Sequence, residues 1–215
     1  MKTKIAHALI ICMVVFAFGV SFYYSPQLPD RVVSHWNAAG QPDGYSSKFW
    51  GVFLVPIILL PFWLLFWLLP KIDPLRANIE KFRPQYNLLL VMLFGFFVYI
   101  HILTILWNLG RQFNFIYAIV PPFAILWFVI GSILPHTQRN WFVGIRTPWT
   151  LSSDEVWRKT HVLGGNLFKG SAVISLLGLA VQEWAIWLVI VPVIASTLWL
   201  LIFSYLEFRK EHTHA

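Results

Sequence analysis

The chain has 215 residues, of which 12% are charged and 58% belong to the hydrophobic set AVILMFWYC. A soluble domain of this size exposes most of its residues to water and carries about 25% charged residues, so the composition argues against a soluble enzyme, a nucleic-acid-binding domain and a disordered chain. The formal net charge is +7, and the single cysteine, Cys12, excludes an intrachain disulfide and a cysteine-based metal site.

Long stretches without Asp, Glu, Lys or Arg predict the membrane-spanning segments. A bilayer core about 30 Å thick needs about 20 apolar residues in an α-helix. The first stretch follows Lys2 and Lys4 and continues to Tyr24, longer than the core of a signal peptide, so we expect it to be retained. The sequence predicts an all-α membrane protein with helices over residues 5–24, 50–69, 87–109, 115–134 and 184–206.

A sixth span is predicted between the last two of these helices, which makes it the fifth in chain order. Ser152 to Glu155 form a capping-box pattern, which is typical of a helix start. We expect an amphipathic helix over residues 153–163 that lies at the membrane interface and leads into a span over 164–182. Gly164 and Gly165 could bend the junction, and one continuous tilted helix is the open alternative.

The distribution of positive charge predicts the topology. With six spans both termini lie on one side, and that side carries 13 of the 16 Lys and Arg residues when residues 135–169 are counted as a loop. Cytoplasmic loops are enriched in Lys and Arg, so we expect both termini in the cytoplasm. The net charge is then explained by topology, and it does not indicate a nucleic-acid partner.

The loop over residues 25–49, on the outer side, is the first of two candidate functional segments. Residues 32–36 predict a short extended segment, and Pro42-Asp43-Gly44 predicts a turn. The polar side chains of His35, Asn37, Asp43 and Lys48 are typical either of a recognition platform or of a loop that satisfies its own backbone. A metal site at His35 is a weaker interpretation, because a third ligand is missing.

The second candidate segment is the inner loop over residues 135–169. Its tryptophans and cations are typical of a segment anchored at the lipid headgroups. The alternative is an inner-facing polar cluster that binds a ligand or reports to a partner, with four members: Asn140, Arg146, Thr147 and His161.

Within the third span, His101, Thr104 and Asn108 share one helix face in the outer half of the membrane. Polar side chains in a membrane span are either interhelical hydrogen-bonding groups or parts of a functional site. In the second case this intramembrane stripe would form the floor of a site beneath His35 and Asn37. Five prolines in the spans predict kinks: Pro56, Pro61, Pro121, Pro122 and Pro192.

Two motifs resemble signatures of known bacterial membrane proteins. The outer motif resembles the signature loop of a small membrane domain of otherwise unassigned function, and comprises Leu28-Pro29, His35-Trp36-Asn37, Gly40 to Tyr45 and Lys48. The inner motif, from Arg139 to Leu151 and Glu155 to His161, resembles the signature of the SdpI immunity family. The two motifs occur in this order in SdpI-like proteins, so the resemblance covers about residues 10–205.

The resemblance implies a multipass protein of the bacterial plasma membrane. Family members protect a producing cell from a secreted, membrane-active toxin peptide and take part in signalling to a cytoplasmic transcriptional repressor. The lipid bilayer, the toxin peptide and the repressor are thus the expected partners, and no enzymatic activity, cofactor or metal is expected. The implied recognition residues of the outer loop are His35, Trp36, Asn37, Gly40, Asp43 and Lys48. The implied inner-loop residues are Asn140, Gly144, Arg146, Thr147, Pro148, Trp149, Trp157 and His161.

We expect a single integral-membrane domain over residues 1–215, with the outer signature in 1–70 and the SdpI-like signature in 110–206. Two other function classes remain open from the residues alone. A membrane enzyme would use His35, His101 or His161 for acid–base chemistry, although His35 and His161 lie on opposite faces. A transporter of small molecules or peptides would expose a water path along the His101 face.

Overall fold

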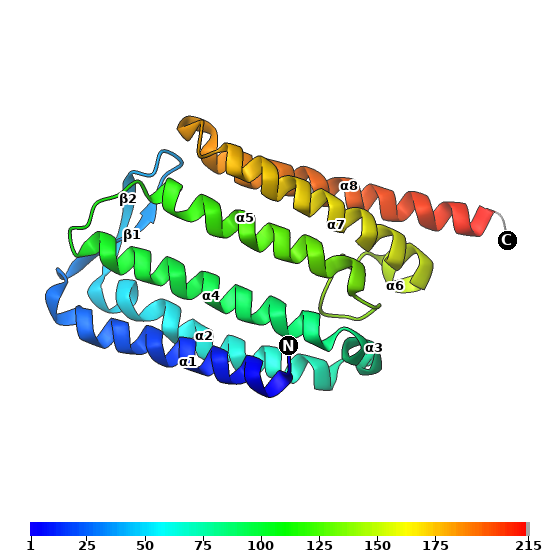
Figure 1. The fold of residues 1–215 in the computed structure, drawn as a ribbon, viewed down its shortest axis with the longest axis horizontal. Helices are drawn as coiled ribbons and strands as arrows, with labels where there is room; N and C mark the ends of the chain where they lie inside the picture. Colours follow the sequence, from blue (N-terminus) through cyan, green and yellow to red (C-terminus); the bar gives the residue numbers. More distant parts are fainter. Residues whose placement is uncertain (214–215) are drawn as a thin grey trace.

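The computed structural model describes residues 1–213 and consists of six long helices, three short helical turns, two short helices and one β-hairpin (Figure 1). The long helices are α1 (Thr3–Tyr24), α2 (Lys48–Ile72), α4 (Arg83–Asn108), α5 (Phe115–Ile133), α7 (Asp154–Leu177) and α8 (Ala185–Thr213). The short helices are α3 (Arg76–Lys81) and α6 (Pro148–Ser152), and the hairpin strands are β1 (Arg31–Trp36) and β2 (Pro42–Ser47). Helical turns cover Ser25–Gln27, Leu134–His136 and Gln182–Trp184.

The helices form two groups that meet in the middle of the bundle. Helices α1, α2 and α4 pack on one another, α5 packs on α7 and α8, and α4 contacts α5. Large buried side chains such as Leu59, Phe82 and Phe94 fill the first group. Most apolar side chains of the long helices nevertheless point outward, since only 11% of the most apolar window of α8 is buried. Such a surface requires an apolar solvent, so the protein is an all-α membrane protein with a small extramembrane hairpin.

The two ends of the bundle differ in structure and in charge. The hairpin and the connection between α4 and α5 lie at one end, here called the hairpin end, and α3, α6 and both termini lie at the other, the terminus end (Figure 1). Only three of the 16 Lys and Arg residues lie at the hairpin end, namely Arg31, Lys48 and Arg111. The positive charge is therefore concentrated at the terminus end.

The five spans predicted from uncharged stretches are confirmed as α1, α2, α4, α5 and α8, which are the helices of the described chain that are long and apolar enough to cross a membrane. The sixth helix, α7, is long but does not meet that hydropathy criterion. The predicted number of six spans is therefore not confirmed, although α7 packs between α5 and α8.

The expected division into a helix over 153–163 and a span over 164–182 is not found, because α7 is one continuous helix from Asp154 to Leu177. The structure therefore has the continuous helix that the sequence left open as the alternative. The two glycines form a helix contact in place of a bend: a Cβ atom on Gly165 would lie 2.7 Å from the Gly131 carbonyl oxygen of α5. Close packing against α5 thus keeps the helix straight through this point. As a consequence Lys169, which the sequence assigned to a loop, lies inside α7. The predicted helix start is correct, since the Ser153 side chain accepts a hydrogen bond from the Val156 amide at 3.2 Å.

Hydroxyl groups of neighbouring helices compensate for the prolines inside the spans. A proline has no amide proton, so the carbonyl four residues earlier loses its helical donor. Four such carbonyls receive a hydrogen bond from another helix, and the donors are Ser21 to Val52, Tyr86 to Phe66, Tyr99 to Ala118 and Ser175 to Leu188. The corresponding prolines are Pro56, Pro70, Pro122 and Pro192. Since water is absent from the bilayer core, these bonds join helices that apolar packing alone would hold less specifically.

We expect Tyr86→Phe to lower the unfolding free energy by about 1–3 kcal/mol, because the buried Phe66 carbonyl then loses its 2.6 Å hydrogen bond. The thermal unfolding midpoint of the purified protein in detergent measures this loss. Tyr205→Phe is the control, because the Tyr205 hydroxyl has no hydrogen-bond partner within residues 1–213. Equal midpoints for the two variants would show that the hydrogen bond from Tyr86 to the Phe66 carbonyl contributes nothing to stability.

Candidate functional site

The hairpin at one end of the bundle is built by an antiparallel pairing of β1 and β2. Val32 and Val33 of β1 are buried against the helices, so the strand is fixed by its apolar side chains. His35 faces Gly44 across the hairpin, and a Cβ atom on Gly44 would lie 2.8 Å from the His35 Cβ atom. Glycine is therefore needed at position 44 for the two strands to approach at His35.

The turn of the hairpin lies earlier in the chain than the predicted turn at Pro42-Asp43-Gly44. Pro42, Asp43 and Gly44 belong to β2, and the chain reverses over residues 37–41. The Asn37 side-chain oxygen accepts hydrogen bonds from the Ala39 and Gln41 amides at 2.9 and 3.0 Å, and Gly40 adopts a φ of 76°. An asparagine that imitates a backbone turn and a glycine in left-handed conformation therefore decide the position of the turn.

A histidine–carboxylate contact and an ion pair lie at the hairpin. His35 Nδ1 lies 2.5 Å from Asp43 Oδ1 across the two strands, and the His35 side chain is 70% exposed. Lys48, the first residue of α2, lies 3.1 Å from the Asp30 carboxylate just before β1. Of the predicted outer residues, His35, Asp43 and Lys48 thus have charged or hydrogen-bonding groups near the surface, whereas Asn37 and Gly40 are occupied with the turn.

The side chain of Asn108, at the end of α4, holds the free edge of β1. Its Oδ1 accepts from the Val33 amide at 2.7 Å, and its Nδ2 donates to the Val33 carbonyl at 2.9 Å. The amide group thus makes the two bonds that a third strand would make. Position 108 therefore couples the hairpin to the membrane-spanning bundle.

The three residues of the intramembrane stripe do not share one environment. Thr104 borders a cavity beneath the hairpin, Asn108 binds β1, and His101 is buried on the side of α1. His101 Nε2 lies 3.0 Å from the Ser21 hydroxyl, which itself donates to the Val52 carbonyl. The His101 Nε2–H group is therefore the donor to Ser21, and His101 joins three helices instead of facing the cavity.

A cavity of about 420 Å³ lies where the hairpin meets the junction of the two helix groups. Its polar rim comes from β1 and the start of the turn, and its apolar walls come from α4, α5 and α8. The lining residues are Ser34, His35, Trp36, Asn37, Ala38, Ile100, Thr104, Phe115, Ile116, Ile119, Ile186, Trp187 and Ile190.

Trp36 is the side chain that joins the hairpin to the walls of this cavity. Its ring stacks on Phe115 with a centroid distance of 3.8 Å and meets Trp107 edge to face at 5.8 Å. The Trp36 indole N–H is buried and has no acceptor among the described residues. Trp36 thus contributes a large aromatic surface to the cavity, while its N–H group is enclosed in the protein.

The wall from α8 is the part of this cavity that sequence reasoning missed. Ile186, Trp187 and Ile190 lie about 150 residues after β1, in a uniformly apolar span with no polar residue to single them out. A tryptophan near the start of a span is typical of a lipid anchor, which gives no sign of a cavity wall.

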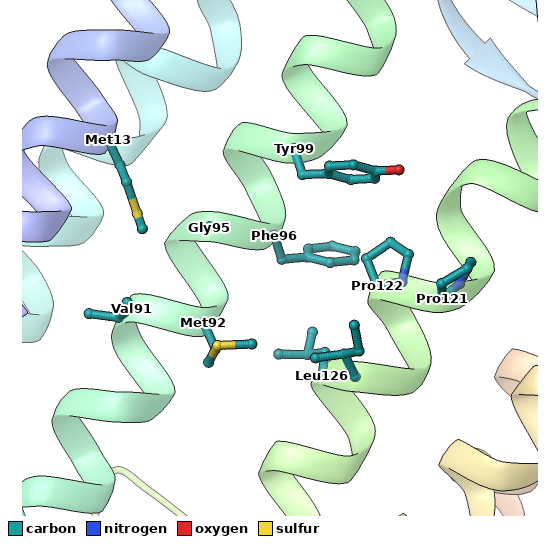
Figure 2. Close-up of a pocket in the computed structure, with 10 residues that line it drawn as sticks. Met13, Val91, Met92, Gly95, Phe96, Tyr99, Pro121, Pro122 and Leu126 are labelled. Atoms are coloured by element: carbon teal, nitrogen blue, oxygen red, sulfur yellow. The ribbon is translucent and has the colours of Figure 1, made fainter. Parts of the chain in front are cut away.

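A second, apolar cavity of about 430 Å³ lies between α1, α4 and α5 (Figure 2). Phe96 of α4 and Pro122 of α5 face one another across it, and Met13 approaches from α1. The Tyr99 hydroxyl donates to the Ala118 carbonyl at 3.0 Å and is thereby occupied. Its lining offers little for polar recognition, so the cavity under the hairpin is the stronger candidate site.

The inner-loop residues form a closed hydrogen-bond network at the terminus end, away from the hairpin. His161 of α7 accepts the Ile145 amide at Nε2, at 2.9 Å, and lies 2.7 Å from the Trp157 carbonyl at Nδ1. These two partners require the neutral ring with its proton on Nδ1. Trp157 stacks on His161 at 4.0 Å and donates to the Thr137 carbonyl. The pair therefore fastens the loop to α7.

The same loop is stabilised by three of its own residues, Asn140, Gly144 and Thr147. Asn140 is fully buried, donates to the Gln138 and Val143 carbonyls, and accepts from the Phe142 and Val143 amides. Gly144 has a φ of 119°, and a Cβ atom there would lie 2.5 Å from His161 Nε2. Thr147 caps α6 in a reciprocal pair with Thr150 and contacts the Ser204 hydroxyl of α8 at 3.0 Å.

Three inner-loop residues lie nearer to the surface. Arg146 and Pro148 are exposed, and Arg146 donates to the Trp141 carbonyl at 2.7 Å. Trp149 packs on Tyr205 of α8 with a centroid distance of 5.0 Å. These side chains and the half-exposed Trp141 form the accessible surface of the inner motif.

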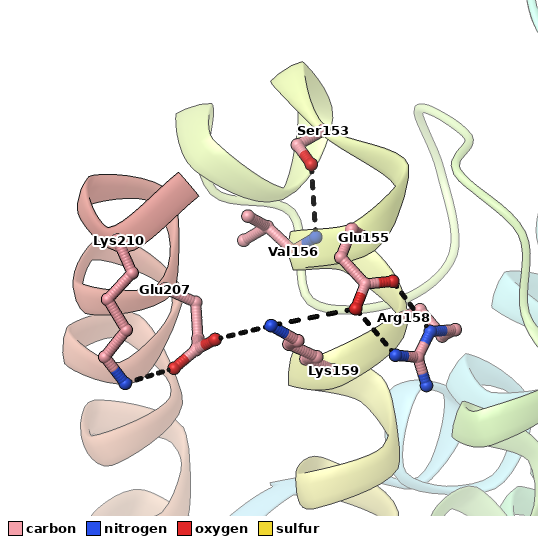
Figure 3. A network of polar contacts seen from close by, with 7 residues as sticks. All are labelled: Ser153, Glu155, Val156, Arg158, Lys159, Glu207 and Lys210. Atoms are coloured by element: carbon pink, nitrogen blue, oxygen red, sulfur yellow. Dashed lines mark hydrogen bonds and ion pairs between the residues drawn. The ribbon is translucent and has the colours of Figure 1, made fainter. Parts of the chain in front are cut away.

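Charged residues beside this surface connect α7 to α8 (Figure 3). Lys159 lies 3.0 Å from one Glu207 oxygen, and Lys210 lies 2.6 Å from the other. Glu155 pairs with Arg158 on the exposed side of α7. Sequence reasoning missed Glu207 and Lys210, because the predicted span ended at residue 206 whereas α8 continues to Thr213. Their spacing of three residues places both on one face of the continued helix.

The outer and inner motifs therefore belong to separate places, at opposite ends of the bundle (Figure 1). Within residues 1–213 no group of three or more His, Cys, Asp or Glu side chains is arranged to hold a metal ion.

Comparisons with known proteins agree with this division into two motifs. Residues 12–60 match the model of a family described as a domain of unknown function, DUF1648, and residues 136–204 match that of the SdpI/YfhL protein family. The chain is similar to the "Immunity protein SdpI" of Bacillus subtilis (strain 168), with 24% identity over 216 residues and 98% of each chain covered. No solved structure matches the chain.

Proposed function

The chain belongs to the SdpI family, and from this premise we propose that it is a membrane immunity protein that protects a bacterium from a secreted, membrane-active toxin peptide. The observation that carries the proposal is the similarity to an immunity protein along 98% of both chains. We further propose that the toxin binds in the cavity beneath the hairpin, and that binding there keeps it from acting on the bilayer.

The chemistry of the cavity suits an amphipathic peptide. Its walls include Trp187 and five isoleucines, which supply apolar contact area for large side chains of a ligand. Its rim carries the polar side chains of His35 and Asn37, and the Trp36 ring joins this rim to the apolar walls. In this proposal His35 belongs to the polar rim and is held by Asp43 across the hairpin, while Gly40 and Asn37 shape the turn beside it. Lys48 lies outside the cavity lining and pairs with Asp30.

We propose that the chain is a single domain in the bacterial plasma membrane with both termini in the cytoplasm. The concentration of Lys and Arg at the terminus end supports this orientation. The hairpin and its cavity would then face the side from which a secreted toxin arrives.

Signalling to a cytoplasmic repressor is a further proposal for the terminus end. The exposed Arg146, Pro148 and Trp141 offer a charged and aromatic surface there, whereas the buried inner-loop residues are occupied in holding the loop. Any coupling to toxin binding requires that the toxin favours one of two arrangements of the bundle.

We expect Trp187→Ala to reduce protection about tenfold or more, because it removes the largest exposed wall of the cavity. The measurement is the survival of a toxin-sensitive bacterium that expresses the chain and is challenged with the secreted toxin of an SdpI-type system. Wild type, empty vector and variants are compared at equal membrane levels.

Trp199→Ala is the matched control, because Trp199 lies on the same helix and is 48% exposed, against 50% for Trp187, but is no part of the cavity. Equal loss in both variants would argue against a binding role for the cavity. If the wild-type chain gives no protection, the proposed immunity to this toxin is contradicted.

A further inference from the structure

A groove lies between α1 and α2 at the terminus end. It has a volume of about 560 Å³, and its lining includes Thr3, Lys4, His7, Trp63 and Trp67. A second hollow of about 190 Å³ shares Ile11 and Trp63 with it and continues along α1 to Val15. From Lys4 to Val15 the two together extend about 16 Å along the helix.

The groove is polar and cationic at its open end and apolar along its length. Lys4 lines it directly, and the Lys71 ammonium lies 3.0 Å from the centre of the Trp67 ring. Arg83 reaches Thr3 at 3.4 Å and also pairs with Glu80. No carboxylate lines the groove among the described residues, and neither Lys4 nor Lys71 has an acidic partner there.

His7 adds an unused donor to the cationic end. The Trp63 indole N–H donates to His7 Nδ1 at 3.2 Å, so the proton of the neutral ring lies on Nε2. The Nε2 atom is buried and has no acceptor in the described chain. A buried donor and two unpaired cations thus surround one end of an apolar channel.

We propose that this groove binds an anionic phospholipid, with the headgroup phosphate beside Lys4, His7 and Lys71 and an acyl chain along Ile11, Leu64 and Val15. The position supports this occupant, because Lys4 and Lys71 lie at the ends of their helices, where the headgroups of a bilayer lie. A soluble anion would use the cations but would leave the channel empty. A lipid fills both parts.

The test is lipid retention by the purified full-length protein, measured by native mass spectrometry with phosphatidylglycerol and phosphatidylcholine. We expect phosphatidylglycerol to bind about tenfold or more tightly than phosphatidylcholine, since each basic side chain near a membrane surface favours an anionic lipid about fivefold. The double variant Lys4→Gln, Lys71→Gln should lose this preference.

Two further variants separate the groove from general charge effects. Arg76→Gln with Arg209→Gln removes the same charge at the same end but outside the groove, and should keep the preference. Ala8→Trp fills the groove from an exposed position and should weaken phosphatidylglycerol binding about tenfold with the charge unchanged.

Equal binding of the two lipids by the wild type would overturn the proposal, as would equal effects of the two double variants. Displacement of phosphatidylglycerol by millimolar inorganic phosphate would also overturn it, because it would show a site for a free anion. Retention of phosphatidylglycerol in phosphate supports the lipid.

Discussion

Gly144→Ala is expected to destabilise the protein by about 2–5 kcal/mol, although it adds only one methyl group. The backbone at Gly144 has a φ of 119°, which L-residues with a Cβ atom rarely adopt. The added Cβ would lie 2.5 Å from His161 Nε2 and 3.1 Å from the Trp157 ring. The loop therefore has to move, and the buried bond between the Ile145 amide and His161 is lost with it. The thermal unfolding midpoint in detergent gives the size of the effect.

Alanine substitutions at two other glycines distinguish the cost of backbone strain from the cost of a steric clash. Gly110 also has a positive φ, of 87°, but a Cβ atom there meets nothing within 4 Å. Gly110→Ala should therefore show the cost of backbone strain alone. Gly170 lies in α7 with open space around it, so Gly170→Ala should be neutral or slightly stabilising. If Gly144→Ala is no worse than Gly110→Ala, the contact with His161 is not what requires glycine.

The inner loop shows how far composition can lead. Its residues could be recognised as a motif, but the sequence left open whether they anchor the loop in lipid or form a binding cluster. In the structure the polar groups of Asn140 and His161 bind the loop's own backbone, while Arg146 remains exposed. Which groups become internal partners depends on the path of residues 137–147, and no periodic pattern specifies an irregular path.

The spans were predictable because membrane helices need length and low charge, and both are read directly from the chain. Helix α7 was the exception, since it carries Lys169 and two adjacent glycines. The sequence suggested an interrupted helix there. Gly165 packs closely on Gly131 and Pro135, and Gly164 packs on Ile145 and Leu200, which only the arrangement of the neighbouring elements reveals.

The hairpin was partly predictable for a similar reason. The extended segment over residues 32–36 agrees with β1, but Pro42-Asp43-Gly44, which predicts a turn, belongs to β2. The side chain of Asn37 makes a tighter local turn, and Gly44 is needed opposite His35. The cavity beneath could not be predicted, because its walls combine residues from β1, α4, α5 and α8 that no spacing brings together.

Asn108→Leu is expected to detach the hairpin from the bundle and to abolish protection against the toxin. Leucine has nearly the shape of asparagine but lacks both hydrogen-bonding groups, so the Val33 amide and carbonyl lose bonds of 2.7 and 2.9 Å. Each unpaired buried backbone group costs about 1–3 kcal/mol, so we expect a loss of about 2–5 kcal/mol. Hydrogen exchange of residues 31–36 should rise strongly, while exchange in the core of α4 should stay slow.

Asn166→Leu is the matched control, because Asn166 is exposed on α7 and its side chain has no hydrogen-bond partner within the described chain. It should leave both hairpin exchange and survival unchanged.

Faster hairpin exchange in Asn108→Leu with full protection would show that the toxin does not need the hairpin in place over the cavity. Unchanged exchange would show that Val32 and Trp36 hold the hairpin by apolar packing alone, and that the amide of Asn108 is dispensable. Loss of protection together with local release of the hairpin, at equal membrane levels, is the result that joins the third span to recognition. It would mean that a polar group at the membrane boundary acts by positioning a strand and makes no contact with the toxin itself.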